Sequence, residues 1–253
     1  MQRIADTDVT KNIESGKKIC SICGTSYEHK QFSPNTRGIW IPACGCEKEQ
    51  AQKEANLAKL RQARKNLRKR YNEAGFPPIS RGERLRKLTC ECKAEAGVYV
   101  DCFKPKRMWG FHYVGTVGSG KTTLAICIGK ELLLKGYSVK FMTFAQCIRL
   151  LQSTYSSKNP LTFDEQLAEL VKTDFLILDD FGREVYKDKA LENAFDLFNS
   201  IYNNKNNVLL TSNPEMIEKV KKIPDFSAML DRLHKMAKYR EFTGKSFRRG
   251  TGQ

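Results

Sequence analysis

The chain has 253 residues, of which 40% are hydrophobic and 28% charged, and its formal net charge is +16. This length accommodates one ordinary hydrophobic core of about 150–200 residues together with a smaller second domain. No stretch approaches the roughly 20 apolar residues of a membrane-spanning helix, and the polar residues 1–18 lack the apolar centre of a signal peptide, so we expect a cytoplasmic protein without membrane contact.

The first informative feature is two closely spaced cysteine pairs. Cys20 and Cys23 form a C-x-x-C-G sequence, and Cys44 and Cys46 form a C-x-C sequence further on. The apolar residues between the pairs are too few to hold a fold of about 30 residues together. Because thiols in a reducing compartment serve as metal ligands rather than as disulfides, we predict a structural Zn²⁺ site with these four ligands. A redox pair and unrelated thiols are the alternatives, and His29 could replace one ligand.

A long helix is predicted next. Residues 47–73 contain neither glycine nor proline and are rich in alanine, glutamate, lysine, glutamine and arginine. Leu57, Leu60, Leu67 and Tyr71 fall near one face, which predicts a narrow docking stripe on an otherwise charged helix. The helix is expected to end at the Ala-Gly-Phe-Pro-Pro sequence that follows, where we place a domain boundary.

The positive charge is concentrated in two stretches. Eight lysines and arginines between Lys53 and Arg70 accompany one acid, Glu54, and residues 235–249 are also basic. Such clusters favour contact with a nucleic acid, either DNA or RNA, over the alternative of a solvated surface.

Residues 79–107 contain three further cysteines. Cys90, Cys92 and Cys102 are too few for a second four-thiolate site, and Ala94, Val98, Tyr99 and Cys102 recur at helical spacing. We therefore predict buried cysteines on a helix that faces the core.

A phosphate-binding loop is predicted at residues 115–122, Gly-Thr-Val-Gly-Ser-Gly-Lys-Thr, which match G-x-x-x-x-G-K-[ST] without interruption. An expected strand at residues 108–114 precedes this loop, and an expected helix at residues 123–133 follows it. The glycines permit turns in which successive N–H groups point at phosphate oxygens, and the N-terminus of the helix adds partial positive charge. Lys121 is expected to reach the β- and γ-phosphates, and the Thr122 hydroxyl to ligate Mg²⁺. The residues expected to bind the nucleotide are Gly115, Gly118, Ser119, Gly120, Lys121, Thr122 and Thr123.

Downstream of the loop, apolar runs alternate with helical segments, as a parallel α/β sheet requires. The expected strands are residues 108–114, 138–142, 175–180, 208–211 and 239–243. The expected further helices are residues 144–155, 163–172, 189–203 and 226–234.

Two acids, Asp179 and Asp180, end a buried strand, and the carboxyl end of a strand is where an open parallel sheet places its ligands. Asp179 is expected to hold Mg²⁺, through water or Thr122, and Asp180 to activate the attacking water. A strand that merely ends in a polar turn is the alternative. Asn213 closes the following strand and could orient the water or contact the γ-phosphate, unless it only belongs to a helix-capping turn before Pro214.

Several of these motifs together resemble AAA+ ATPases of the bacterial helicase-loader group, the DnaC/DnaI and IstB-like family. The resemblance covers about residues 70–249 and rests on the loop at 115–122, Asp179-Asp180, Thr211-Ser212-Asn213, Asp231-Arg232-Leu233 and Gly244-x-Ser246-x-Arg248. The front end, C-x-x-C-G to C-x-C-E followed by a charged helix, also resembles the zinc-bearing module of phage-type loaders. The fold implied is an α/β AAA+ P-loop NTPase with a five-stranded parallel sheet.

The resemblance also implies a division of the chain and further site residues. It implies a zinc-binding, helicase-interacting module at residues 1–46, a charged linker helix at 47–75 and an AAA+ ATPase domain at 76–253. Arg232 would be an arginine finger that reaches the nucleotide of a neighbouring subunit, and Arg248 a phosphate sensor within its own subunit. The related initiators carry a DNA-contacting insertion where this chain has Arg149, Tyr155 and Lys158, and basic and aromatic groups together suit a single strand.

The predicted function is that of an ATP-dependent loader. It would place a DnaB-type replicative helicase hexamer on single-stranded DNA, use ATP, Mg²⁺ and Zn²⁺, and self-assemble through its ATP site. Hydrolysis is expected to be slow, because Asp179-Asp180 stands where many AAA+ enzymes have Asp-Glu. One alternative is an IstB-like ATPase that regulates a transposase. Another is a nucleic-acid-binding adaptor without ATPase activity, against which Lys121, Thr122 and Asp179 argue.

Overall fold

The computed structural model describes residues 18–34, 38–90, 92–156, 159–182, 188–223 and 226–243. The chain divides into two compact units, residues 1–66 and residues 67–253. This division falls inside the long helix, so the functional division at residues 46/47 and 75/76 stays a prediction. None of the helices in the described ranges is both long and apolar enough to cross a lipid bilayer.

The first unit contains a small antiparallel hairpin. Strand β1 (Tyr27–Lys30) pairs with β2 (Ile39–Pro42), with Tyr27 opposite Pro42. Tyr27 is the one buried residue of these two strands. A sheet of two short strands is marginal by itself in water, so this unit needs another source of stability.

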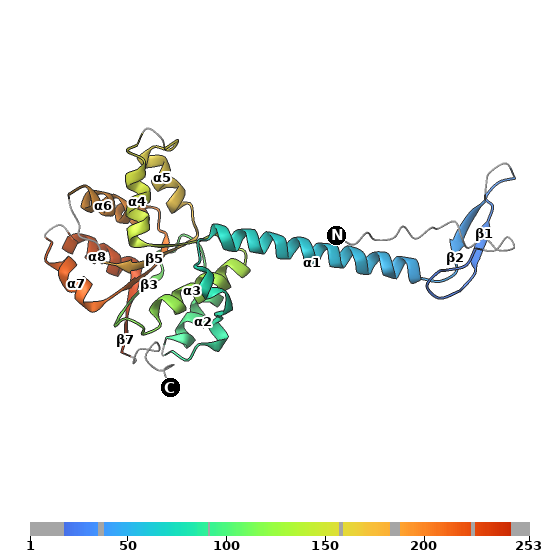
Figure 1. Cartoon of the computed structure of the whole chain (residues 1–253), viewed down its shortest axis with the longest axis horizontal. Helices are drawn as coiled ribbons and strands as arrows, with labels where there is room; N and C mark the ends of the chain where they lie inside the picture. The colour runs from blue at the N-terminus through green and yellow to red at the C-terminus, as the bar shows by residue number, and fades with distance from the viewer. Residues whose placement is uncertain are drawn as a thin grey trace. The chain divides into compact units, whose positions relative to one another are not determined.

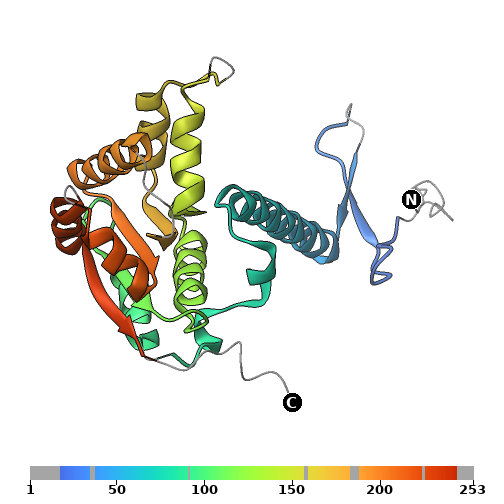
Figure 2. The ribbon, with the colours of Figure 1, turned by 60° about the vertical axis from the view of Figure 1, so that its left-hand side comes forward.

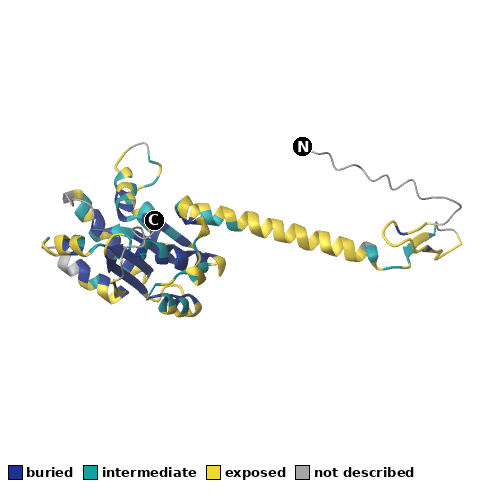
Figure 3. Ribbon diagram, turned by 60° about the horizontal axis from the view of Figure 1, so that its bottom comes forward, coloured by how far each residue is buried: buried dark blue, intermediate teal, exposed yellow. Residues whose placement is uncertain are grey.

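Helix α1 (Cys46–Glu73) begins in the first unit and ends in the second. Its middle is exposed (Figure 3), and this exposed part includes Leu57 and Leu60. Leu67 and Tyr71 pack instead against a core of the second unit. The predicted apolar stripe is therefore correct for its second half and wrong for its first.

The second unit is built on a five-stranded parallel sheet with the strand order β4-β5-β6-β3-β7. The strands are β3 (Gly110–Gly115), β4 (Val139–Thr143), β5 (Phe175–Phe181), β6 (Asn207–Ser212) and β7 (Ala237–Phe242). The central strands are buried on both faces, which explains why β5 begins with four consecutive apolar residues. The predicted α/β fold with five parallel strands is confirmed.

Helices cover both faces of this sheet (Figures 1 and 2). One face carries α2 (Lys93–Cys102) and α3 (Lys121–Leu134). The other carries α4 (Phe144–Ser153), α5 (Phe163–Val171), α6 (Asp188–Asn203), α7 (Pro214–Lys221) and α8 (Phe226–Met236). Two short 3-10 helices, η1 (Pro78–Gly82) and η2 (Leu85–Lys87), connect α1 with α2.

Alternate residues of each strand face opposite cores. In β3, Phe111 and Tyr113 belong to the core beneath α3, whereas Val114 belongs to the core beneath α4 to α8. The same alternation in β5 sends Ile177 toward α3 and Leu178 toward the other core. The alternation along a strand therefore also decides toward which face of the sheet a residue at its carboxyl end points.

The structure corrects one prediction made from spacing and adds one helix that was not predicted. Helix α2 forms, but its buried face consists of Ala96, Tyr99 and Val100, while Val98 is 60% exposed and Cys102 is exposed as well. The prediction of buried cysteines is therefore correct for Cys92, which lies in the core, and wrong for Cys102; Cys90 is partly buried and packs against the same core. Helix α7 was not predicted, because it is short and largely polar; Pro214 at its start is favourable there, since the first turn of a helix needs no N–H from that residue.

Candidate nucleotide site and cysteine cluster

The phosphate loop joins the end of β3 to the start of α3, as predicted. Gly118 and Gly120 have φ values of 83° and 91°, which a residue with a side chain adopts only with strain. A Cβ on Gly115 would lie 2.6 Å from the carbonyl oxygen of Phe242 on β7. The glycines of the motif are thus required by the turn itself and by the close approach of an adjacent strand.

Lys121 opens helix α3 and is 7% exposed. Its Nζ donates to the carbonyl oxygens of Gly115 and Thr116, at 2.7 and 2.8 Å, so the ammonium group lies within the curve of the loop. The side chain of Asn213, at the end of β6, has its Oδ1 3.5 Å from the same Nζ. The structure therefore brings together two of the predicted site residues from segments 92 residues apart.

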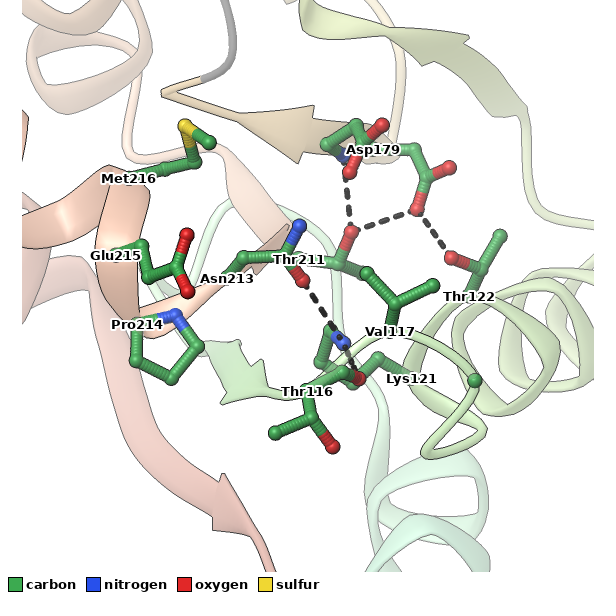
Figure 4. Close-up of a pocket in the computed structure, with 12 residues that line it drawn as sticks. Thr116, Val117, Lys121, Thr122, Asp179, Thr211, Asn213, Pro214, Glu215 and Met216 are labelled. Atoms are coloured by element: carbon green, nitrogen blue, oxygen red, sulfur yellow. Dashed lines mark hydrogen bonds between the residues drawn. The ribbon is translucent and has the colours of Figure 1, made fainter. Parts of the chain in front are cut away.

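Thr122, the next residue of α3, donates a hydrogen bond of 2.8 Å to Oδ1 of Asp179. The same carboxylate oxygen accepts a second bond of 2.6 Å from the hydroxyl of Thr211 on β6 (Figure 4). Burial raises the pKa of Asp179, and the two hydroxyl donors act in the opposite direction. A cation beside this carboxylate would favour its charged form.

Asp180 has a φ of 62°, in the left-handed region, and its backbone N–H donates 3.0 Å to Oγ1 of Thr211. The register between β5 and β6 shifts at this point, between Leu178 and Phe181. The carboxyl end of β5 is therefore irregular at the two acids, whereas the sequence predicts a straight strand.

These residues surround a cavity of about 770 Å³, within the range of small-molecule sites (Figure 4). Its lining residues are Thr116, Val117, Gly118, Lys121, Thr122, Asp179, Asp180, Thr211, Asn213, Pro214, Glu215 and Met216. A second cavity of about 300 Å³ also borders the loop and is lined by Glu83, Lys87, Leu88, Thr89, Cys90, Gly118, Gly120, Lys121, Thr122 and Thr123. Gly118, Lys121 and Thr122 line both cavities.

The donor set fits a nucleotide with Mg²⁺. The Thr122 hydroxyl and the Asp179 carboxylate supply adjacent oxygen ligands of the kind that Mg²⁺ prefers. Lys121 and the N-terminus of α3 supply the positive charge that a polyphosphate requires.

The cysteine cluster lies at the junction of the hairpin and α1, in the first unit. The sulfur atoms of Cys20, Cys23, Cys44 and Cys46 all lie within 4.8 Å of one another. A tetrahedral zinc site with Zn–S bonds of about 2.3 Å needs sulfurs about 3.8 Å apart, so the four thiols fit this metal. The ring of His29 lies against Trp40 instead, with 4.8 Å between the ring centres.

Three further predicted site residues, Arg149, Tyr155 and Arg232, line neither of the two cavities beside the phosphate loop. Arg232 on α8 is half-buried, and its guanidinium carbon lies 5.5 Å from the ring centre of Phe195. Arg149 is exposed on α4, whereas the Tyr155 hydroxyl donates 2.6 Å to the buried Asn193 on α6. Lys158 and Arg248 fall outside the described residues.

Two parts of the site were missed from the sequence. Thr211 was noticed only as part of a strand end, although the alternation of β6 directs it to the same face as Asp179. Residues 83–90 were interpreted only as connecting chain and cysteines, because nothing in their composition points to the phosphate loop. A hydroxyl residue on the strand beside a predicted magnesium ligand is the signal that could have found Thr211.

The fold and the site together define the class of protein. A phosphate loop on β3, an Asp on β5 and a polar residue at the end of the intervening β6 are the parts of a P-loop NTPase of the AAA+ class. The chain belongs to the family of IstB-like ATP binding proteins, whose pattern matches residues 110–252.

The chain is similar both to a helicase loader and to an insertion-sequence protein. Over 144 residues the chain is 31% identical to the replicative helicase loader DnaC of Escherichia coli (strain K12), a match that covers 54% of this chain and 57% of that protein. Over 139 residues it is 32% identical to a Sinorhizobium fredii protein named for an insertion sequence and for ATP binding, covering 53% and 45% of the two chains. The chain therefore spans about half the length of the curated relatives it matches.

The crystal structure of the DnaC helicase loader has a similar fold. Its TM-score with this chain is 0.57 at 20% sequence identity, and the superposition covers 66% of this chain and 100% of that one. This similarity supports the fold of the second unit.

Proposed function

We propose that this chain is an ATP-dependent loader that places a DnaB-type replicative helicase on single-stranded DNA. The observation that carries the ATP-dependent part is the bond of 2.8 Å between Thr122 and Asp179, because it joins two Mg²⁺ ligands beside a phosphate loop. The helicase-loading part is supported by the 31% identity to DnaC.

ATP would lie across the phosphate loop. Its phosphates would contact the N–H groups of the loop and Lys121, and Thr122 and Asp179 would hold Mg²⁺, which neutralises developing charge on the phosphates. The nucleoside would occupy the smaller cavity, where Leu88, Thr89 and Cys90 lie beside the loop.

Hydrolysis would use the larger cavity. Asp180 is the candidate to activate the water, and Asn213 is the candidate to orient it or contact the γ-phosphate, since both line this cavity. Arg232 does not line the cavity of its own chain, and we propose that it completes the site of a neighbouring copy.

The first unit would bind the helicase. The exposed apolar side chains in and beside its hairpin are Ile19 at 44%, Ile22 at 52%, Phe32 at 74%, Ile39 at 52% and Trp40 at 38%. A group of exposed apolar side chains on so small a unit suits a protein partner, and zinc bound by the four cysteines would hold the hairpin that presents them. The exposed Arg149 and the half-exposed Tyr155 are the candidates for contact with DNA, together with Lys158.

A loading experiment tests this proposal. The chain is mixed with a DnaB-type helicase hexamer and a circular single strand, and helicase bound to the circle is measured with ATP, without nucleotide and with Lys121→Ala. We expect the wild-type chain to load the helicase when ATP is present, and we expect no loading without nucleotide or with the Lys121→Ala variant. Loading that is equal in all three conditions would contradict the ATP-dependent role.

A transposase regulator is the second candidate, because the insertion-sequence relative matches at 32% identity. A pull-down with a DnaB-type helicase and an IS21-type transposase as competing baits separates the two, and capture of the transposase alone would replace our proposal. A measurement of phosphate released from ATP distinguishes the loader and the transposase regulator, which should hydrolyse ATP, from an adaptor without ATPase activity.

A further inference from the structure

Thr211 contacts both acids of the site at once. Its Oγ1 donates 2.6 Å to Oδ1 of Asp179 and accepts 3.0 Å from the backbone N–H of Asp180. The residue is 1% exposed, so these bonds are shielded from solvent. One buried hydroxyl is therefore shared between the side chain of one acid and the backbone of the next.

The pairing register between β5 and β6 explains why Thr211 contacts both Asp179 and Asp180. Leu178 pairs with Leu210 and Phe181 pairs with Ser212, which leaves two residues of β5 opposite the single Thr211 of β6. This is a β-bulge, a feature that re-aims side chains and is frequent beside active sites.

The bulge determines which way Asp180 points. Regular alternation would send Leu178 and Phe181 to opposite faces, yet both are buried in the core beneath α4 to α8. Asp180 absorbs the extra residue with its φ of 62°, a conformation that aspartate tolerates better than most residues. Regular alternation already directs Asp179 toward Thr122 of α3, and the bulge turns Asp180, which lines the larger cavity.

We propose that Thr211 is a positioning residue for ATP hydrolysis, which fixes the Mg²⁺ ligand Asp179 and holds the bulge that presents Asp180. This inference rests on the proposed ATPase function. Thr211 would occupy one oxygen of Asp179 through a hydrogen bond and thereby set the orientation of the carboxylate. Partners of this kind, which orient a metal ligand without touching the metal, typically contribute about 10- to 100-fold in metal affinity or activity.

The test compares Thr211→Val with Thr211→Ser. Valine has nearly the shape of threonine but lacks the hydroxyl, whereas serine keeps it. We expect the valine variant to lose about 10- to 100-fold in kcat and to need several-fold more Mg²⁺ for half-maximal rate, with nucleotide affinity in the absence of Mg²⁺ within about threefold of wild type. The serine variant should recover most of the rate and the Mg²⁺ dependence.

A second measurement does not depend on catalysis. Hydrogen exchange of the Asp180 amide in the nucleotide-free protein should accelerate in Thr211→Val and not in Thr211→Ser, because only valine removes its acceptor. Ser212→Ala is the matched control: Ser212 is also a buried hydroxyl residue of β6, but it bonds to His112 on the opposite face of the sheet. The Ser212→Ala variant should leave the hydrogen-exchange rate of the Asp180 amide and the Mg²⁺ dependence of hydrolysis unchanged.

The outcomes separate this inference from the proposed function. If the wild-type chain hydrolyses ATP and folded Thr211→Val has the same kcat, Mg²⁺ dependence and Asp180 exchange, Thr211 is not a positioning residue. If the wild-type chain neither binds nor hydrolyses ATP, the ATPase function fails, while faster exchange of Asp180 in Thr211→Val would still establish the bulge-holding role.

Discussion

Thr122 and Asp179 lie 57 positions apart in the chain, yet the hydroxyl of the first donates a bond of 2.8 Å to the carboxylate of the second. Thr122 lies in the first turn of the helix after the phosphate loop, and Asp179 lies near the end of a parallel strand separated from the loop's own strand by β6. Their contact brings together the two residues that we propose as ligands of Mg²⁺.

Replacement of Lys121 by alanine should abolish tight ATP binding. The change removes the ammonium group that lies within the loop and leaves a small, neutral side chain at the start of α3. Binding of a fluorescent ATP analogue measures the loss, and circular dichroism checks the fold. Lys172→Ala, which removes an exposed lysine of an ion pair with Glu169, is the control and should bind normally. Equal affinity in both variants would contradict the assignment of the loop.

The cysteine cluster predicts a zinc-dependent first unit. Cys20→Ser with Cys23→Ser should abolish zinc binding and unfold the hairpin, because two short strands are not stable alone. Helicase binding should be lost, while nucleotide binding by the second unit should stay within about twofold, since the second unit has its own core. Cys102→Ser, an exposed cysteine outside the cluster, is the control. Zinc is measured by elemental analysis of protein purified without chelator; a content near zero in the wild type would refute the site.

Lys130 should stabilise the chain segment that carries Glu83, a lining residue of the smaller cavity. This lysine of α3 is 3% exposed and donates to the carbonyl oxygens of Ser80 and Glu83, the second at 3.1 Å. Lys130→Met keeps the aliphatic stem but leaves both carbonyls without this donor, so we expect a loss of about 1.5–3 kcal/mol in unfolding free energy. Nucleotide affinity should fall as well, because Glu83 lines the cavity. Lys135→Met, which removes a more exposed lysine at the C-terminal cap of the same helix, should change the nucleotide affinity little. Equal losses of affinity in the two variants would argue against a supporting role of Lys130.

His112 should make the second unit sensitive to acid. Burial lowers the pKa of this fully buried histidine to about 3, far below its unfolded value near 6.5. The unfolded state therefore binds the proton more readily, so the stability is fully present above pH 6.5 and is lost as the pH falls from there toward 3. The loss should approach about 1.4 kcal/mol per pH unit, the value for one proton.

His112→Gln tests this effect, because glutamine can still bond to Ser212 and does not titrate. Urea unfolding is followed by the fluorescence of Trp109 in a Trp40→Phe background between pH 7 and pH 4. The difference in stability between the two proteins should narrow or reverse as the pH falls. Parallel curves would show that His112 does not take up a proton in this range.

The sequence predicted this fold well where a local pattern was strong, as in the four apolar residues before Asp179 or the uninterrupted loop at 115–122. It failed where tertiary contacts decide. The bulge at Asp180 depends on pairing with Thr211, and the exposed face of α2 depends on which side meets α3. The cavity beside Leu88 is formed by chain segments whose approach no local pattern encodes.

Arg232 provides the last prediction. Helix α8 buries Met229, Leu230 and Leu233 on its own unit, as expected from its apolar spacing, and Arg232 lies at the edge of that face against the ring of Phe195. A cation over an exposed ring contributes about 0.5–1 kcal/mol, so a purely structural Arg232 would affect stability slightly and hydrolysis little. An arginine finger acting on the nucleotide of a neighbouring copy is worth about 10³-fold or more in rate.

Mixing two inactive variants distinguishes these roles. Arg232→Ala should bind ATP normally but lose ATPase activity in the assembled state, and Lys121→Ala should be inactive because it does not bind ATP. In a mixture, an intact Arg232 on the Lys121 variant faces an intact nucleotide site on the Arg232 variant, so composite sites form and part of the activity returns. The rescue should depend on the mixing ratio, and sedimentation should confirm assembly. If assembled mixtures show no activity at any ratio, Arg232 does not act between subunits, and its contact with Phe195 is then its structural role.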